Sequence, residues 1–263
     1  IISHMALLFE LHEIVSCYLF RLTRDSDLSI DEESDDFLEE IKASIKKRKT
    51  GRPVRLEVEN DCDAESLAVL EEMLPIEKEK VISLAGPLDL TRFSKFASIP
   101  GCSSMSYEPI VPVSEPADFV GYEDIFAAIR AHDCMIHHPY ESFGVVVDFV
   151  RAAAEDPDVL AIKQTLYRVS GNSPIVAALM RAAENGKQVT VLVELKARFD
   201  EENNIHWAQK LEKAGCHVVY GLSGLKTHCK ILLVVRREED GIRRYVHMGT
   251  GNYNDSTAKI YTD

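Results

Sequence analysis

The chain has 263 residues, of which 46% are hydrophobic and 28% charged, and its formal net charge is −13. The apolar fraction is that of a globular protein and excludes a disordered one, whereas the acidic balance excludes the wide positive field that broad binding of nucleic acid or anionic lipid requires. No apolar run approaches the ~20 residues that cross a bilayer, and no basic-then-apolar leader is found, so we expect neither a membrane-spanning nor a secreted protein.

Cysteines are scattered along the chain without a C-x-x-C pair. Both a disulfide framework and a zinc ribbon need a different spacing. We therefore predict reduced thiols in a cytoplasmic protein. The six cysteines are Cys17, Cys62, Cys102, Cys134, Cys216 and Cys229.

The first half is predicted to form part of a small α+β domain over residues 13–115. Residues 1–12 are set aside as an irregular remnant of a cleaved expression tag, because Ser3-His4-Met5 has the sequence of such a scar. The acidic residues within 31–36 begin a predicted helix, so we interpret them as a solvated face that complements the helix dipole rather than as metal ligands. Hydrophobic periodicity predicts strands over 14–22 and 52–59 and helices over 30–49 and 64–73.

A proline-rich stretch follows these elements. Five prolines lie within residues 86–118, together with Gly101 and several serines. This composition is typical of a loop-rich connection. We place the domain boundary near residues 110–118 and the second domain over residues 116–263.

The second half alternates strands with helices. Ser173, followed by Pro174, and Asp200 are expected to cap two of the helices. Because the strands are almost wholly apolar, the predicted fold class is α/β, with a parallel or mixed sheet and helices on both faces. Ligands of such sheets bind beyond the carboxyl ends of the strands. Strands are predicted over 159–166, 189–195, 217–220, 228–235 and 243–248, and helices over 142–154, 174–186 and 200–215.

Basic residues gather at these strand ends. Residues 163–230 hold ten basic and six acidic residues, which makes this segment net +4 within an acidic chain. Arg168, Arg198 and Lys226 each lie beside a predicted strand end. The arginine fork matches phosphate oxygens and lysine supplies a compact charge. We therefore predict a phosphate-rich ligand.

His228 lies between Lys226 and Lys230 at the start of a predicted strand. Flanking cations lower an imidazole pKa and keep the ring neutral, as a nucleophile toward phosphorus requires. The alternative is an ordinary half-buried histidine. Cys229 is assigned to the core, because side chains alternate along a strand. His137 and His138 are interpreted as a structural loop, and His247 as a strand residue.

Two of these motifs resemble the signature of the phospholipase D superfamily. His228-x-Lys230 matches its His-x-Lys element, and Gly249-Thr250-Gly251-Asn252 matches its Gly-Ser/Thr-x-Asn turn. The aspartate of that signature is missing, since Val235 lies five residues after Lys230. This difference weakens the prediction of a hydrolytic phosphodiesterase.

Longer motifs resemble the polyphosphate kinases of the long, ATP-using bacterial type. The resemblance implies phospholipase D-like catalytic domains preceded by part of a head domain. It also implies that this chain is a fragment, truncated in its first catalytic half and inactive alone. The motifs are Phe20–Asp25, Pro53–Glu57, His137–Phe143, Leu166–Arg168, Val193–Glu201, Lys226–His228, His247–Asn254 and Tyr261–Asp263.

The resemblance implies a role for each matching residue. His228 is expected to carry the phosphohistidine, Arg168 and Arg198 to hold phosphate and, through it, Mg²⁺, and Tyr261 to line the ATP site. Lys226, Lys230 and Asn252 are expected to contact substrate. An arginine cannot ligate a metal directly, so Mg²⁺ would be held through phosphate oxygens.

The implied function is reversible transfer of the ATP γ-phosphate to polyphosphate. Its expected partners are ATP, ADP and inorganic polyphosphate, without nucleic acid, in a full-length homo-oligomer. The expected location is the cytoplasm, with peripheral membrane association as part of a polyphosphate kinase complex. The alternatives are a phospholipase D-like phosphodiesterase and a non-catalytic module for phosphate binding or assembly.

Overall fold

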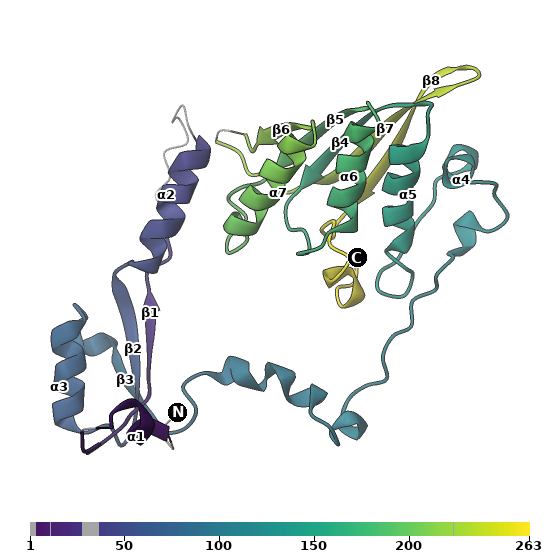
Figure 1. The fold of residues 1–263 in the computed structure, drawn as a ribbon. Coiled ribbons are helices and arrows are strands. Elements are labelled where there is room, and N and C mark those ends of the chain that lie inside the picture. The colour runs from purple at the N-terminus through teal and green to yellow at the C-terminus, as the bar shows by residue number, and fades with distance from the viewer. Residues whose placement is uncertain (1–3, 11, 28–36, 223) are drawn as a thin grey trace. The chain divides into compact units, whose positions relative to one another are not determined.

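The computed structural model describes residues 4–10, 12–27, 37–222 and 224–263 (Figure 1). The chain divides into two compact units, one formed by residues 1–29 and 44–108 and the other by residues 30–43 and 109–263. The acidic residues 31–36, and the start of the helix predicted there, lie outside the described residues. Within the described ranges, no helix is both long enough and apolar enough to cross a bilayer.

The first unit contains a three-stranded sheet in the order β1-β2-β3, formed by β1 (Phe20–Arg24), β2 (Pro53–Glu59) and β3 (Val81–Leu84). β1 is antiparallel to β2, and β3 is parallel to it. The strand predicted from residue 14 begins only at Phe20. Val15 is 92% exposed, so its β-propensity finds no neighbouring strand to pack on.

Helices and short 3-10 turns complete the first unit. Asp63 caps α3 (Ala64–Met73) by accepting a hydrogen bond of 2.7 Å from the Ser66 N–H, and the helix has the predicted bounds. α2 (Phe37–Lys49) crosses the division between the units. The remaining helices are α1 (Met5–Leu8), η2 (Lys78–Lys80), η3 (Leu90–Ser98) and η4 (Ser103–Met105).

The second unit is built on a five-stranded mixed sheet, which confirms the predicted α/β class and the mixed sheet. The strand order is β6-β5-β4-β7-β8; β4, β5 and β6 are parallel, β7 is antiparallel to β4, and β8 is antiparallel to β7. The strands are β4 (Val159–Leu166), β5 (Gln188–Val193), β6 (His217–Tyr220), β7 (Lys230–Glu238) and β8 (Gly241–Gly249).

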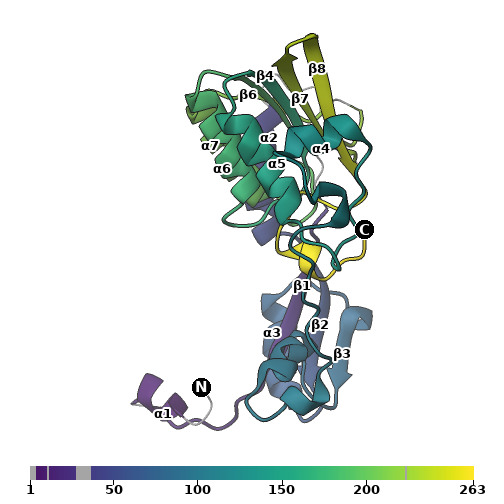
Figure 2. The same cartoon turned by 90° about the vertical axis from the view of Figure 1, so that its right-hand side faces the viewer.

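A helix layer covers one face of this sheet (Figures 1 and 2), whereas the sequence predicted helices on both faces; the other face carries exposed side chains such as Lys163 and Ile231. Alternate strand residues such as Ile162, Val191 and Leu232 are fully buried on the covered face, as the two-residue period of a strand requires. The layer consists of α5 (Gly144–Glu155), α6 (Pro174–Glu184) and α7 (Glu201–Lys213), beside α4 (Ile125–Ala131) and the short turns η5 (Ala117–Phe119) and η6 (Thr257–Lys259).

The strand directions bring distant segments to one edge of the sheet. The parallel strands β4, β5 and β6 all end at this edge. Because β7 is antiparallel to β4, it begins here, and because β8 is antiparallel to β7, it ends here, with Lys230 opposite Gly249. Segments that follow β4 and β5, precede β7 and follow β8 therefore meet.

Candidate active site

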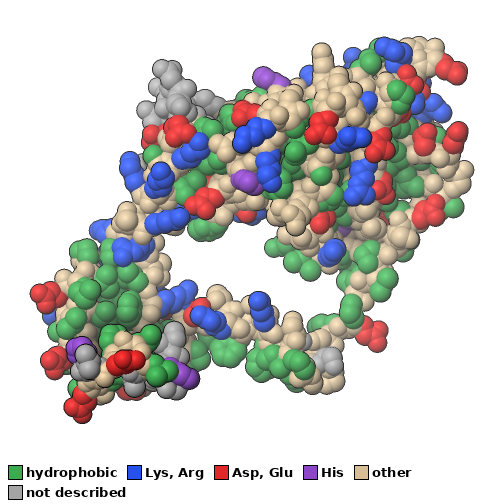
Figure 3. Space-filling model, viewed as in Figure 1, with side chains coloured by type: hydrophobic (Ala, Val, Ile, Leu, Met, Phe, Trp, Pro, Cys, Tyr) green, Lys and Arg blue, Asp and Glu red, His purple; other side chains and the backbone are tan. Residues whose placement is uncertain are grey.

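A cavity of about 420 Å³ lies at this edge of the sheet. Five of the predicted site residues line it, namely Arg168, His228, Lys230, Asn252 and Tyr261. On the face seen in Figure 3, basic and acidic side chains are interspersed over the second unit rather than gathered in one broad patch. The cavity itself is lined by two cations, Arg168 and Lys230, and one carboxylate, that of Asp263.

The imidazole of His228 is held against an aromatic ring and a lysine. Its ring meets Tyr167 edge to face, with the centroids 5.0 Å apart. Lys230 Nζ lies 3.3 Å from both ring nitrogens of His228 and donates a 2.6 Å hydrogen bond to its backbone carbonyl. The Nζ atoms of Lys226 and Lys230 lie 5.5 and 5.4 Å from the centroid of the Tyr167 ring. Tyr167 therefore organises three groups of the predicted site.

The cations act on the protonation of His228. Lys230 makes the largest contribution to lowering the pKa of His228, followed by desolvation, Lys226 and Arg168. Burial, and the neighbouring Arg168 and Lys226, also lower the pKa of Lys230, although Cys229 opposes this. The neutral imidazole, which can attack phosphorus, is therefore the favoured form at neutral pH.

This electrostatic effect predicts the titration of His228. We expect the NMR signal of its Cε1–H to titrate with a midpoint below the ordinary histidine value of about 6.5. Lys230→Gln removes the charge that contributes most to lowering the pKa of His228, so the midpoint should move to higher pH. Lys213→Gln, an exposed change on α7, should leave the midpoint where it is. Equal midpoints in the wild-type and Lys230→Gln chains would contradict the assigned cause.

Arg168 is anchored from two sides. Its Nε donates to Asp200 Oδ2 at 2.6 Å, and one terminal nitrogen donates to the Arg198 carbonyl at 3.0 Å. Asp200 occupies the N-cap position of α7 but makes no side-chain capping bond, so the predicted capping role is wrong. Its carboxylate binds Arg168 instead. Phe199 adopts a φ of 72° in this turn, a conformation that is costly for a residue other than glycine.

A buried carboxylate joins the strand end to the His228 loop. Glu194 is 1% exposed; its Oε1 accepts from the Lys196 N–H at 3.0 Å and its Oε2 from the Thr227 N–H at 2.7 Å. Asn204, on α7, donates to the carbonyls of Tyr167 and Glu194 at 2.7 and 2.9 Å. These positioning residues were missed by the sequence-based prediction, although a carboxylate within an apolar run was a usable signal.

We expect Glu194→Gln to destabilise the second unit by about 1–3 kcal/mol, because one of the two backbone N–H groups would face an amide donor and stay unsatisfied. Urea unfolding followed by the fluorescence of Trp207, the single tryptophan, reports on this unit. Glu184→Gln is the matched control, since Glu184 is exposed and forms a solvent-exposed ion pair with Arg181. Equal unfolding midpoints in the two variants would contradict the positioning role.

The turn that follows β8 also lines the cavity, through Thr250, Gly251 and Asn252. The Oδ1 atom of Asn252 is buried without a hydrogen-bond partner among the described residues. A Cβ on Gly251 would lie only 1.5 Å from Asp263 Oδ2, so a larger residue at position 251 would have to displace this carboxylate. Tyr261 also lines the cavity and is 64% exposed.

Other predicted positions differ from the expectation. Arg198 and Lys226 do not line the cavity; Arg198 contacts Arg168 through its carbonyl, and Lys226 lies over Tyr167. Cys229 is exposed, so its assignment to the core is wrong. The alternation along β7 explains this, because buried Lys230 and Leu232 are separated by exposed Ile231, and Cys229 lies on the same exposed face as Ile231.

The donor groups suit a metal that arrives with phosphate. Of the residues that line the cavity, Asp263 alone carries a carboxylate, and Asn252 offers its unpartnered Oδ1. Arg168 and Lys230 are cations and cannot ligate Mg²⁺. Mg²⁺ commonly keeps several waters and binds through one or two carboxylates plus substrate phosphates. The residues present therefore fit phosphate-bound Mg²⁺ better than a bare ion.

Comparison with known proteins gives consistent matches. The family model of the polyphosphate kinase C-terminal domain 1 matches residues 124–263, and that of the polyphosphate kinase middle domain matches residues 1–96. The latter match includes residues 1–12, so these residues align with the family although part of them resembles a tag scar.

Individual relatives match over nearly the whole chain. The polyphosphate kinase of Halalkalibacterium halodurans is 58% identical over 97% of this chain and 37% of that protein, and that of Streptomyces coelicolor is 51% identical over 100% and 36%. The crystal structure of the polyphosphate kinase from Porphyromonas gingivalis has a TM-score of 0.69 and 29% identity, covering 99% of this chain and 36% of that one. The chain thus spans little more than a third of these relatives.

Proposed function

Because the chain belongs to the polyphosphate kinase family, we propose that it carries the phosphate-accepting histidine of an ATP:polyphosphate phosphotransferase. The observation that carries this proposal is the position of His228. Its ring lines a cavity together with Arg168 and Asn252, and Lys230 Nζ lies 3.3 Å from both of its nitrogens. A nucleophile and the charge that phosphoryl transfer needs are thus present at one place.

The proposed reaction has two steps. A neutral ring nitrogen of His228 attacks the γ-phosphorus of ATP, an N–P bond forms, and the bond between the γ-phosphorus and the bridging oxygen breaks as ADP leaves. The terminal oxygen of polyphosphate then attacks the phosphohistidine and releases the imidazole. The reverse sequence makes ATP from ADP and polyphosphate.

The other residues have supporting roles in this proposal. Arg168 and Lys230 bind phosphoryl oxygens from within the cavity, with Arg198 and Lys226 at its margin. Tyr261 lines the nucleotide site, and Asn252 offers its amide. Mg²⁺, held through phosphate oxygens, would supply further charge neutralisation. The free thiols of all six cysteines support the cytoplasm as the place of action, and we keep a homo-oligomer as part of the proposal for the full-length protein.

A phosphodiesterase remains the second candidate, because His228, Lys230 and the Gly249 turn match that superfamily. Val235 argues against it. This residue, at the position of the missing aspartate, lies within β7 and pairs with Ala161 and Arg244. A full-length polyphosphate kinase carrying this segment should exchange phosphate between ATP and polyphosphate and should not cleave a chromogenic phosphodiester. The opposite pair of results would favour the phosphodiesterase.

For the 263-residue chain alone we expect weak binding of ATP or polyphosphate without turnover. The Arg168 side chain is 42% exposed, and salt screens such a charge over about 8–10 Å at physiological ionic strength. Calorimetric titration should therefore show an affinity that falls steeply as NaCl is raised. Affinity independent of NaCl would contradict a charge-based site, and turnover equal to that of a full-length kinase would contradict the need for a larger enclosure.

A further inference from the structure

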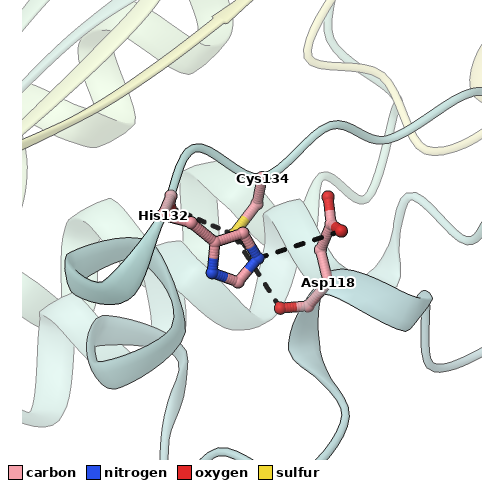
Figure 4. Close-up of side chains that lie close together, drawn as sticks. All are labelled: Asp118, His132 and Cys134. Atoms are coloured by element: carbon pink, nitrogen blue, oxygen red, sulfur yellow. Dashed lines mark hydrogen bonds and ion pairs between the residues drawn. The ribbon is translucent and has the colours of Figure 1, made fainter.

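Three potential metal ligands converge outside the candidate active site. Asp118, His132 and Cys134 each offer one ligand atom, and these atoms lie within 4.8 Å of one another. His132 Nε2 is 3.8 Å from Asp118 Oδ1 and 3.9 Å from Cys134 Sγ. Figure 4 shows the three side chains pointing toward one another from two segments of the chain.

The local structure explains why the segments meet. Asp118 lies in η5, and His132 is the C-cap residue of α4, with Cys134 two residues later. Asp124 caps the start of α4 by accepting a 2.7 Å hydrogen bond from the Ala127 N–H. The short helix α4 thus turns the chain back, so that residues 132–135 return to η5.

Neighbouring groups orient two of the ligand atoms. The hydroxyl of Tyr122 is hydrogen-bonded to Nδ1 of His132 at 3.2 Å, and the Met135 N–H donates to Asp118 Oδ2 at 2.8 Å. These two hydrogen bonds occupy Nδ1 of His132 and Oδ2 of Asp118, which are not the proposed ligand atoms. Nε2 of His132 and Oδ1 of Asp118 are thereby directed to the inside of the cluster. Outer contacts of this kind fix the ring orientation and tautomer of histidine ligands in metal sites.

We propose that Asp118 Oδ1, His132 Nε2 and Cys134 Sγ form a Zn²⁺ site. Sulfur, imidazole nitrogen and carboxylate oxygen are all ligands of zinc, at about 2.0–2.3 Å from the ion. In a tetrahedral site such bonds place the ligand atoms roughly 3.3–3.6 Å apart. The two separations that involve His132, 3.8 and 3.9 Å, therefore need to shorten by only a few tenths of an ångström. The third, between Asp118 and Cys134, is at most 4.8 Å and needs to shorten by no more than about 1.3 Å. Mg²⁺ and Ca²⁺ are disfavoured, because they select oxygen ligands.

The site would be three-coordinate from the protein, with a fourth position open to water. Its effect on the fold would be to tie η5 to the segment after α4. That segment also borders a second cavity, of about 440 Å³, which Cys134 lines together with Gly249, the last residue of β8, and with Gly251 and Asp263, which follow β8. Gly251 lines this second cavity and the cavity of the candidate active site as well. A zinc ion bound to Cys134 would thus stabilise a segment that lies beside the candidate active site.

Zinc chloride titrated into the purified 263-residue chain, in competition with a chromophoric chelator, tests this proposal. We expect one tightly bound ion per chain, which is lost in Cys134→Ser and in His132→Gln. Cys102→Ser and His137→Gln are the matched controls; they replace a half-buried cysteine and an exposed histidine outside the cluster and should bind zinc like the wild type. Co²⁺ in place of Zn²⁺ should give a thiolate-to-metal absorption band that Cys134→Ser removes.

A second variant protects the test against misfolding. Tyr122→Phe keeps all three ligands and removes only the hydroxyl that orients His132, so it should weaken zinc binding roughly 10-fold. Circular dichroism verifies the fold of each variant. Absence of saturable zinc binding, unchanged binding in Cys134→Ser, or a cobalt complex without the thiolate band would each overturn the proposal.

Discussion

His228→Ala, introduced into a full-length polyphosphate kinase that carries this segment, should abolish acid-labile labelling of the protein by γ-³²P-ATP. Turnover should fall by on the order of 10⁴-fold or more, as when the nucleophile of a covalent mechanism is removed. The reason is that Lys230, Lys226 and Arg168 are cations with no lone pair to donate. They can bind phosphate but cannot replace an imidazole that accepts it.

His206→Ala is the matched control for this experiment. His206 is an exposed histidine of the same unit, on α7, where its ring contacts Trp207 rather than the cavity. Its replacement should leave labelling and turnover unchanged. Label that persists in His228→Ala would show that another residue accepts the phosphate, and the assignment of His228 would then fail.

The fold of the second unit was accessible from the sequence because its strands are short apolar runs with polar ends. β4 and β6 have the predicted bounds, and β5, β7 and β8 differ by a few residues. The apolar runs of these strands also locate the edge at which Arg168 and His228 meet. The sequence did not indicate β3, because a strand of four residues that pairs with β2 alone carries too little pattern.

The hydrogen bonds of Glu194, which position the segments of the candidate site, could not be predicted in the same way. Glu194 binds Thr227 across 33 residues of sequence, and such a contact depends on which strands are neighbours and in what register. The order β5-β4-β7 places β4 between the two segments that this carboxylate joins. Periodicity shows which residues are buried, but it does not show which distant backbone group a buried polar atom will meet.

The zinc cluster shows the same limit. Asp118, His132 and Cys134 have no spacing that resembles a zinc motif, and α4, which brings them together, was not predicted. The helix has only seven residues and follows a proline-rich stretch. Its capping residue Asp124 was the available local signal.

Arg168→Lys should lower kcat/KM by roughly 30- to 1,000-fold, equivalent to about 2–4 kcal/mol of transition-state stabilisation. Arg168 uses Nε and one terminal nitrogen to bind Asp200 and the Arg198 carbonyl, which leaves the rest of its fork for phosphoryl oxygens in the cavity. A lysine ammonium can approach either Asp200 or a phosphate, but it cannot reproduce both sets of directed bonds. Conserving the charge should therefore not conserve the rate.

Arg181→Lys separates this geometric requirement from a general loss of arginine. Arg181 lies on α6 and makes an exposed ion pair with Glu184 at 3.8 Å, so its replacement should leave kcat/KM unchanged. Asp200→Asn adds a second comparison, because it retains an oxygen for Arg168 Nε but removes the charge that holds the guanidinium in place; its loss should be smaller than that of Arg168→Lys. If Arg168→Lys matched Arg181→Lys, Arg168 would be an ordinary surface cation, and Lys230 would be the one cation left to bind phosphate among the residues that line the cavity.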